Sequence, residues 1–214
     1  MITAARDEQR PARLLAAERD ALLPILRSTP QPDFDRPTAC PGWSVRDVLA
    51  HCGSALSRVT SGDLHAFTPD LNEIDVAERR SWPLPRVLAE LACGYDRAGQ
   101  KIAASGGKLD VIALGEWLHG GDVRDALDQP LAYASDGFWD ACALLADFTR
   151  RRRVPLTEAV LADRTLSLGV SLPGRRSATL ITDNATLMRL FADRSAPTAS
   201  YQLTGARPEE LIVF

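Results

Sequence analysis

A carboxylate and an imidazole three positions apart, Glu116 and His119, are the residues with the clearest capacity for chemistry in this sequence. At about 100° of helical rotation per residue, both fall on one stripe whose other members, such as Ile112 and Val123, are apolar. An unpaired carboxylate among core side chains is strongly unfavourable, so Glu116 needs a partner. A divalent cation is one such partner, because Glu-x-x-His on a bundle helix projects both groups toward a shared metal.

A second imidazole, His51, ends the stretch "TACPGWSVRDVLAH" on another predicted helix. Ser44 is a helix-capping residue, and Asp47 three positions later completes a near capping box, which predicts a helix from Ser44 to about residue 60. On that helix His51 lies about 60° from Val48 and about 90° from the middle of the apolar face. It therefore occupies the flank of the buried stripe, from which a ring can reach the groove between two helices.

Taken together, His51, Glu116 and His119 make a set of two imidazoles and one carboxylate. Three protein ligands leave at least one coordination position open, which is typical of a catalytic metal site. The alternatives stay open at this level, because a single buried histidine is commonly structural and Glu116 with His119 can be an ordinary i,i+3 contact. Asp122 and Arg124 are interpreted as structural, either as an ion pair on the helix surface or as a buried aspartate.

Long helices must position these residues. Leucines at helical spacing predict a first helix over residues 11–28, in which Pro24 predicts a kink or an earlier end. The same periodicity predicts further long helices over residues 83–105, 110–127 and 135–153, and a short one over 71–80. Long helices with moderate connections predict a helical bundle that builds its site from inward side chains on facing helices.

The sequence pattern changes after Pro155. Alternating apolar residues predict strands, and "DNATLMRLFADR" predicts a capped helix between them. The predicted strands are residues 164–172, 177–182, 200–205 and 211–214. The expected fold is therefore mainly α: a four-helix bundle carrying the metal site over residues 1–153, then a small α+β domain over 154–214.

Composition bounds the possible partners. The chain has 214 residues, of which 45% are hydrophobic and 25% charged, as in an ordinary globular protein. A net charge of −3 gives no electrostatic reason to expect nucleic acid as a partner. We expect no membrane span, because the sequence has no apolar run of about 18 residues. The four cysteines are scattered without a CxxC pair, which favours a reduced, cytoplasmic protein. His65 lies in a polar loop, and we expect no functional role for it.

Three segments resemble the mycothiol-dependent maleylpyruvate isomerase family, within the wider DinB-like superfamily. They are "RPTACPGWSVRDVLAHCGSAL", "EWLHGGDVRDALDQPL" and, more loosely, "LMRLFADRSAPTASYQLTGARPEELIVF". The resemblance implies a DinB-like four-helix bundle with a divalent metal, usually zinc, held by His51, His119 and the acidic Glu116. The family's acidic ligand lies four residues before the second histidine, where this chain has Gly115, whereas Glu116 lies three before it.

The resemblance also implies a reaction that depends on mycothiol, a low-molecular-weight thiol. The metal would lower the pKa of that thiol, whose thiolate then adds to a small electrophilic substrate. Release of the thiol after bond rotation gives an isomerase, and retention gives an S-transferase. No protein cysteine acts as nucleophile in this scheme, and Arg194 of the smaller domain would bind a substrate carboxylate. The expected partners are small molecules, with no nucleic acid or membrane, and the protein is expected to be a monomer or homodimer.

Two other functions remain open. One is a metal-dependent hydrolase of the same bundle that uses activated water on a different substrate. The other is a non-catalytic, metal-free member of the family that serves as a binding module, for which Gly115 at the expected acidic position is the reason in the sequence.

Overall fold

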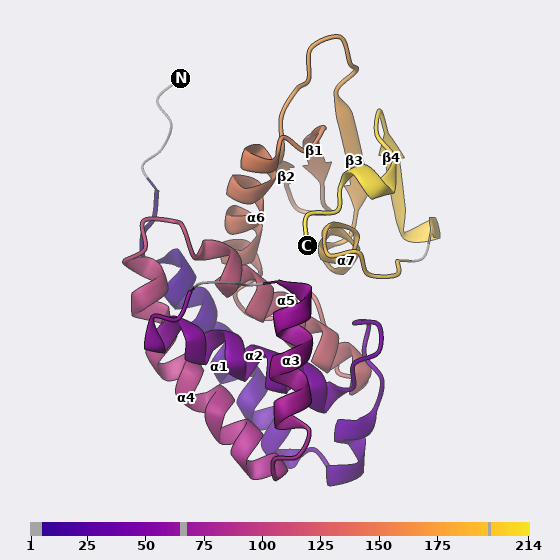
Figure 1. Ribbon diagram of the computed structural model, residues 1–214. Helices are drawn as coiled ribbons and strands as arrows, with labels where there is room; N and C mark the ends of the chain where they lie inside the picture. The colour runs from indigo at the N-terminus through magenta and orange to yellow at the C-terminus, as the bar shows by residue number, and fades with distance from the viewer. Residues whose placement is uncertain (1–5, 65–67, 197) are drawn as a thin grey trace.

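Helices make up the larger, N-terminal part of the chain, and a small sheet with one helix follows them (Figure 1). The computed structural model describes residues 6–64, 68–196 and 198–214. The helices of the first part are α1 (Arg10–Ser28), α2 (Val45–Ser61), α3 (Pro69–Arg79), α4 (Leu84–Ala103), α5 (Asp110–Ala126) and α6 (Phe138–Arg152). Helix α1 continues through Pro24 to Ser28, so the earlier end that this proline allowed does not occur.

Four of these helices, α1, α2, α4 and α5, form a ring of contacts that encloses the core of the bundle. Helix α3 packs on α2, and α6 packs on α1 and α5. The bundle thus brings α2 and α5, the helices of His51 and His119, into direct contact. In the described part of the chain, no helix combines the length and hydropathy that a membrane span requires.

A tight turn and a complete capping box fix the start of α2. Trp43 N–H donates to Cys40 O at 3.1 Å, and Gly42 takes a positive φ of 78° that favours glycine. The Ser44 side chain accepts a hydrogen bond from Asp47 N–H, while the Asp47 carboxylate accepts one from Ser44 N–H. This start sets the helical rotation at which His51 emerges from α2.

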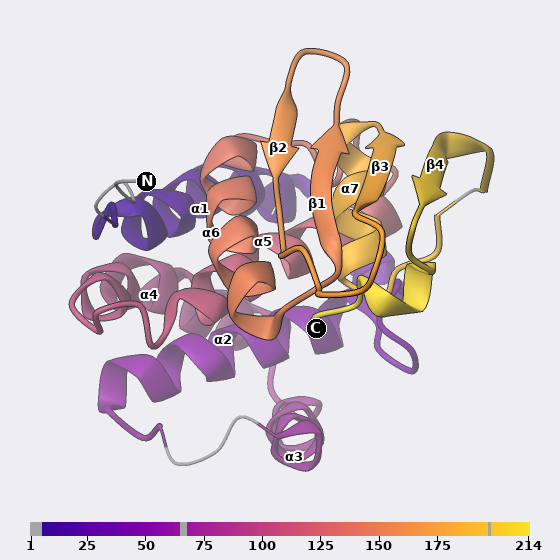
Figure 2. The same cartoon turned by 90° about the horizontal axis from the view of Figure 1, so that it is seen from above.

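The C-terminal part is a four-stranded mixed sheet with helix α7 (Asn184–Phe191) (Figure 2). Its strands, β1 (Leu156–Val160), β2 (Thr165–Ser167), β3 (Ala178–Thr182) and β4 (Tyr201–Thr204), have the order β2-β1-β3-β4. The central pair β1 and β3 is parallel, and the outer pairs are antiparallel. The predicted fold, mainly α with a small α+β part at the C-terminus, is confirmed.

Some predicted strands differ from the structure. Residues 211–214 form no strand, since a 3₁₀ turn precedes them and Val213 N–H donates to Phe191 O at the end of α7. The strand expected over 164–172 ends at Ser167, because Gly169 N–H bonds the Thr149 hydroxyl instead of a neighbouring strand. Strand β1 was not predicted. The alternation of apolar residues in these short segments shows which side chains are buried but not where the backbone hydrogen bonds go.

The boundary expected near residue 154 falls between the end of α6 at Arg152 and the start of β1 at Leu156. One continuous cluster of buried apolar side chains nevertheless runs through both parts of the chain. The division into domains 1–153 and 154–214 therefore stays a prediction.

Candidate metal centre

Two consecutive buried glycines, Gly120 and Gly121, let neighbouring side chains pack closely on the C-terminal half of α5. A Cβ at Gly120 would overlap with the Glu18 carboxylate, and one at Gly121 would crowd the Tyr133 ring. The space at Gly120 lets Glu18 of α1 reach Arg124, whose Nη1 donates to Glu18 Oε1 at 2.6 Å. Arg124 thus pairs with Glu18, and an ion pair between Asp122 and Arg124 on the helix surface does not form.

The structure brings the two predicted histidines together. The rings of His51 from α2 and His119 from α5 lie 5.0 Å apart between centroids, at 83° to each other. The ring of Trp43, from the turn before α2, also packs on His51, with 5.0 Å between ring centroids. Burial, and secondarily the neighbouring His119, lower the pKa of His51 to about 3. His51 is therefore a neutral imidazole, which is the form that binds metals.

Glu116, the predicted acidic ligand, is a buried carboxyl group with an incomplete set of hydrogen bonds. The residue is 2% exposed, and its Oε2 atom has no hydrogen-bond partner among the described residues. Burial raises the pKa of Glu116 well above its usual range, although a hydrogen bond from the Cys52 thiol acts in the opposite direction. A buried carboxyl oxygen without a partner is unfavourable, and a bound cation would relieve it.

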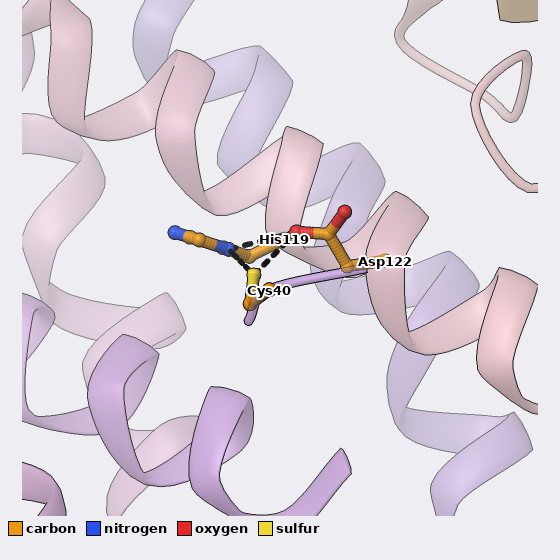
Figure 3. A group of neighbouring side chains, drawn as sticks. All are labelled: Cys40, His119 and Asp122. Atoms are coloured by element: carbon orange, nitrogen blue, oxygen red, sulfur yellow. Dashed lines mark hydrogen bonds and ion pairs between the residues drawn. The ribbon is translucent and has the colours of Figure 1, made fainter. Parts of the chain in front are cut away.

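A second group of potential ligands shares His119 and is formed by Cys40, His119 and Asp122 (Figure 3). Cys40, His119 and Asp122 have ligand atoms within 4.8 Å of one another, and these residues could hold a metal ion. Within the described ranges no other three such side chains approach so closely, so the ligand atoms of His51, Glu116 and His119 do not all converge to this extent. The distances are 3.0 Å from His119 Nδ1 to Asp122 Oδ2 and 3.1 Å from Cys40 Sγ to the same oxygen.

The negative charge of Asp122 is already balanced by a cation of the protein. Arg194, from the C-terminal part, donates from Nε to Asp122 Oδ1 and from Nη2 to Oδ2, both at 2.8 Å. The Tyr133 hydroxyl donates to Oδ1 at 2.6 Å. Burial alone would raise the pKa of Asp122, but the hydrogen bonds from His119 and Arg194 hold it well below its usual range. Asp122 is therefore ionised, and a cation bound at this group would meet the Arg194 guanidinium.

Sequence reasoning missed Cys40 as a possible ligand and interpreted Asp122 only as structural. The available signal for Cys40 was its place in the "CPGW" turn, which fixes the thiol beside the entrance to α2. Arg194, predicted to bind substrate, lies at this same site. His65 lies outside the described residues.

By donor type, the two imidazoles and the buried Glu116 carboxyl group match the nitrogen and oxygen ligands that zinc takes in catalytic sites. By distance, the group whose ligand atoms converge in the described residues is Cys40, His119 and Asp122. At Gly115, where the family pattern has its acidic residue, an added Cβ would meet nothing within 4 Å. Gly115 itself has no side chain to offer as a ligand. Glu116, the next residue, is the acidic residue of α5 that is nearest in sequence to this position.

The paired histidines thus lie on two contacting helices, α2 and α5, of a helical bundle that is followed by a small mixed sheet. The sequence profile described as the mycothiol maleylpyruvate isomerase N-terminal domain matches residues 15–128. The chain belongs to this family. No curated protein sequence matches it.

Two solved structures resemble the whole chain. The crystal structure of the mycothiol-dependent maleylpyruvate isomerase has a TM-score of 0.57 at 13% sequence identity, with 95% of this chain and 96% of that chain covered. A histidine-to-alanine mutant of that enzyme has a TM-score of 0.56 at 12% identity, with the same coverage. At such identity the likeness establishes the shared fold, in both the helical part and the C-terminal part.

Proposed function

We propose that the protein is a metal-dependent S-transferase or isomerase that uses a low-molecular-weight thiol, mycothiol, on a small electrophilic substrate. In this proposal His51, His119 and Glu116 hold a divalent metal, and their nitrogen and oxygen donors favour zinc. The observation that carries it is the edge-to-face pair of His51 and His119, 5.0 Å apart, on the two helices of the family's motifs. The partnerless carboxyl oxygen of Glu116 supports it further.

The buried cysteines near the site are poor nucleophiles, which supports a proposal in which a cosubstrate supplies the reactive thiol. Burial, and then the Asp122 charge, raise the pKa of Cys40 to about 12, and the pKa of Cys52 also lies well above its usual value. Both side chains are therefore protonated and unreactive at neutral pH, because the thiolate is the nucleophile. A bound metal would supply the missing chemistry by lowering the pKa of the cosubstrate's thiol. All four cysteines are free, which is in keeping with a reducing, cytoplasmic setting.

Metal binding through Cys40, His119 and Asp122 is the competing arrangement, since their ligand atoms lie close together. One feature weighs against it. The Arg194 guanidinium already balances the charge of Asp122, so a cation bound there would meet a second positive charge. The proposal therefore assigns the metal to the side of His119 that faces His51.

A metal-free binding module is the second candidate function. The specific observation in its favour is Gly115, which leaves open space where the family pattern has its acidic ligand. In that case the buried Glu116 carboxyl group would remain protonated, with Cys52 as its hydrogen-bond donor.

Metal analysis combined with a thiol-dependent assay tests the proposal. Protein purified without an affinity tag and supplemented with zinc should hold one zinc ion per chain, and it should consume a bimane electrophile only when mycothiol is present. The His51→Ala variant should lose both properties, whereas Cys40→Ser should keep its zinc. Absence of bound zinc in the unmodified protein, with an unchanged melting temperature in chelator, would overturn the proposal in favour of the binding module.

A further inference from the structure

Asp122 is the centre of a buried network that spans the two parts of the protein. Its side chain is fully buried, and both carboxylate oxygens accept hydrogen bonds. Donors come from α5 itself (His119), from the segment before α6 (Tyr133), from the turn before α2 (Cys40) and from the C-terminal part (Arg194). No atom of this carboxylate is left for a small-molecule ligand without the loss of a donor.

The bond from Asp122 fixes one nitrogen of the His119 ring. His119 Nδ1 lies 3.0 Å from Asp122 Oδ2, and a carboxylate can only accept, so the imidazole donates its hydrogen from Nδ1. The other ring nitrogen, Nε2, is then the one with a free lone pair. Metal-binding histidines commonly donate their second nitrogen to a carboxylate in this way, and that partner sets both the tautomer and the ring orientation.

Arg194 reaches this network from a rigid turn at the end of α7. Asp193 takes a positive φ of 55°, and Arg194 N–H donates to Arg189 O at 2.8 Å, which closes the turn. All three guanidinium nitrogens have partners within the protein, since Nη1 donates to Ala192 O while Nε and Nη2 bond Asp122. These contacts favour a role in holding Asp122 over the binding of a substrate carboxylate.

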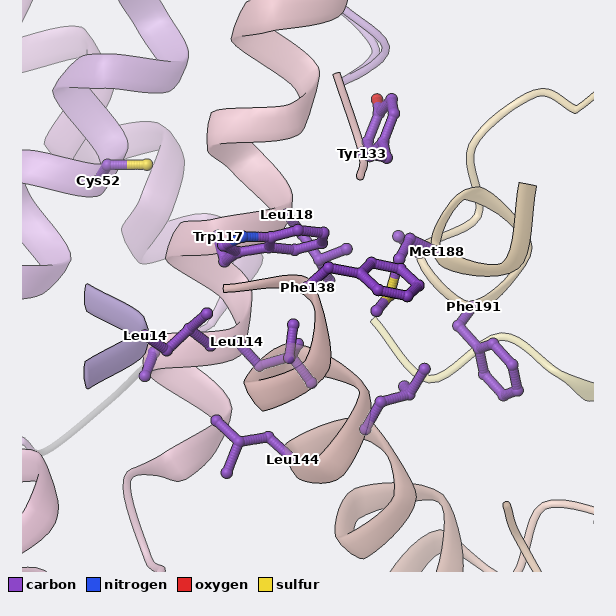
Figure 4. Packing of buried hydrophobic residues seen from close by; sticks show 14 of the residues in the cluster. Leu14, Cys52, Leu114, Trp117, Leu118, Tyr133, Phe138, Leu144, Met188 and Phe191 are labelled. Atoms are coloured by element: carbon purple, nitrogen blue, oxygen red, sulfur yellow. The ribbon is translucent and has the colours of Figure 1, made fainter. Parts of the chain in front are cut away.

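Packing between α5, α6 and α7 keeps Arg194 in place. Figure 4 shows Trp117 of α5, Phe138 of α6 and Met188 of α7 in one row of buried side chains. The Trp117 and Phe138 rings lie 6.2 Å apart between centroids. Buried apolar side chains thus join the C-terminal part to the helical part, in addition to the ion pair between Arg194 and Asp122.

We propose that Asp122 and Arg194 are positioning residues that hold His119 with its hydrogen on Nδ1 and present Nε2 toward His51. The inference rests on the proposed metal site, and it makes the C-terminal part a component of that site. Arg194 acts through Asp122, and Asp122 acts through His119, so neither residue contacts the metal.

The chain offers a control ion pair that also joins α5 to the C-terminal part. Asp125, one turn after Asp122 on α5, forms a second ion pair with the C-terminal part through Arg189 Nη2 at 2.6 Å. The Asp125→Asn variant therefore removes a more exposed ion pair between the same two parts of the protein, and no hydrogen bond or ion pair among the described residues joins Asp125 to His119. Arg194→Lys is the milder variant of the network, because it keeps the positive charge and loses the bidentate geometry.

Two measurements on the full-length protein test the inference. The first is zinc affinity, by competition with a chromophoric chelator. Asp122→Asn should weaken zinc binding by about 10–100-fold and Arg194→Lys by a smaller factor, while Asp125→Asn should bind zinc like the unmodified protein. Equal affinities in all four proteins would overturn the inference and leave the proposed metal site intact.

The second measurement is the tautomer of His119 in the metal-free protein, by long-range ¹H–¹⁵N correlation at alkaline pH. The chain has three histidines, so His51→Gln and His119→Gln variants assign the signals. The unmodified protein and Asp125→Asn should show His119 protonated at Nδ1, and Asp122→Asn and Arg194→Lys should show a mixture. An unchanged tautomer in Asp122→Asn would overturn the inference. This readout decides the matter even if the unmodified protein binds no zinc, a result that would refute the proposed function alone.

Discussion

Two carboxyl groups, Glu18 and Glu116, are buried in the interior of the same bundle, and their surroundings differ. Glu18 is 0% exposed and pairs with Arg124 through both of its oxygens. Glu116 is 2% exposed, and its nearby hydrogen-bond donor is the neutral thiol of Cys52. Glu18 is thus balanced by a cation within the protein, whereas burial favours the neutral form of Glu116, which has no such cation in the described part of the chain.

Removal of the Glu18 partner should produce the largest effect. The Arg124→Met variant leaves a buried carboxylate without a counter-charge, and we expect it to lower the free energy of unfolding by about 3–5 kcal/mol. Urea denaturation followed by circular dichroism measures this difference. The double variant Glu18→Leu with Arg124→Leu is the control, and it should lose less than Arg124→Met alone. Equal stability of Arg124→Met and the unmodified protein would show that Glu18 does not depend on this pair.

The next largest effect on stability should come from alanine at Gly120, which contacts Glu18, and it should differ from that of alanine at Gly115, which precedes Glu116. In Gly120→Ala the new methyl group overlaps with Glu18 and forces its pair with Arg124 to move, at a cost of about 1–3 kcal/mol. In Gly115→Ala the methyl group enters open space, and the better helix propensity of alanine should stabilise α5 by up to about 1 kcal/mol. Thermal unfolding of both metal-free variants checks the contrast. A loss of stability in Gly115→Ala as large as that in Gly120→Ala would contradict it.

Glu116→Gln should have a smaller effect on stability, and one that depends on pH. The pKa of Glu116 is raised in the folded protein, so its protonated form favours folding, and this contribution is lost as pH rises through the folded-state pKa. Metal-free Glu116→Gln should match the unmodified protein within about 1 kcal/mol in mildly acidic solution. It should become the more stable of the two as pH rises. Denaturation at a series of pH values measures this, and parallel profiles would show that Glu116 does not titrate in this way.

A partly exposed surface carboxylate, Glu210, should give the smallest effect. The Arg175 side chain donates to both oxygens of Glu210 at 2.8 Å, and this contact lowers the pKa of Glu210 to about 2. The small stabilisation is present above the ordinary pKa of glutamate and is lost as pH falls toward 2. In Arg175→Ala, carboxyl NMR should find the pKa of Glu210 raised toward its usual value, with little change in melting temperature. An unchanged pKa would contradict the assignment of the shift to Arg175.

The sequence was most informative where helical periodicity decides the outcome. Capping at Ser44 and rotation along α2 predicted His51 at the edge of the core, and its ring lies against His119. The stripe on α5 predicted that Glu116 is buried. These features depend on the local geometry of single helices, which the spacing of apolar residues specifies.

Contacts between distant segments could not be predicted in this way. Arg194 and Asp122 are 72 positions apart, and their pairing depends on the turn after α7 and on where the C-terminal part lies relative to α5. Likewise, the partner of Arg124 is Glu18, 106 positions away, and only the arrangement of α1 beside α5 reveals it. Short strands such as β1 were missed because their hydrogen bonds, rather than their residue types, define them.

Crystallographic location of zinc by anomalous scattering at its absorption edge tests the central claim most directly. We predict one strong peak between the rings of His51 and His119, within about 2.0–2.2 Å of a nitrogen of each ring and of a Glu116 oxygen. A peak beside Cys40 and Asp122, or no peak in protein crystallised with excess zinc, would contradict the claim.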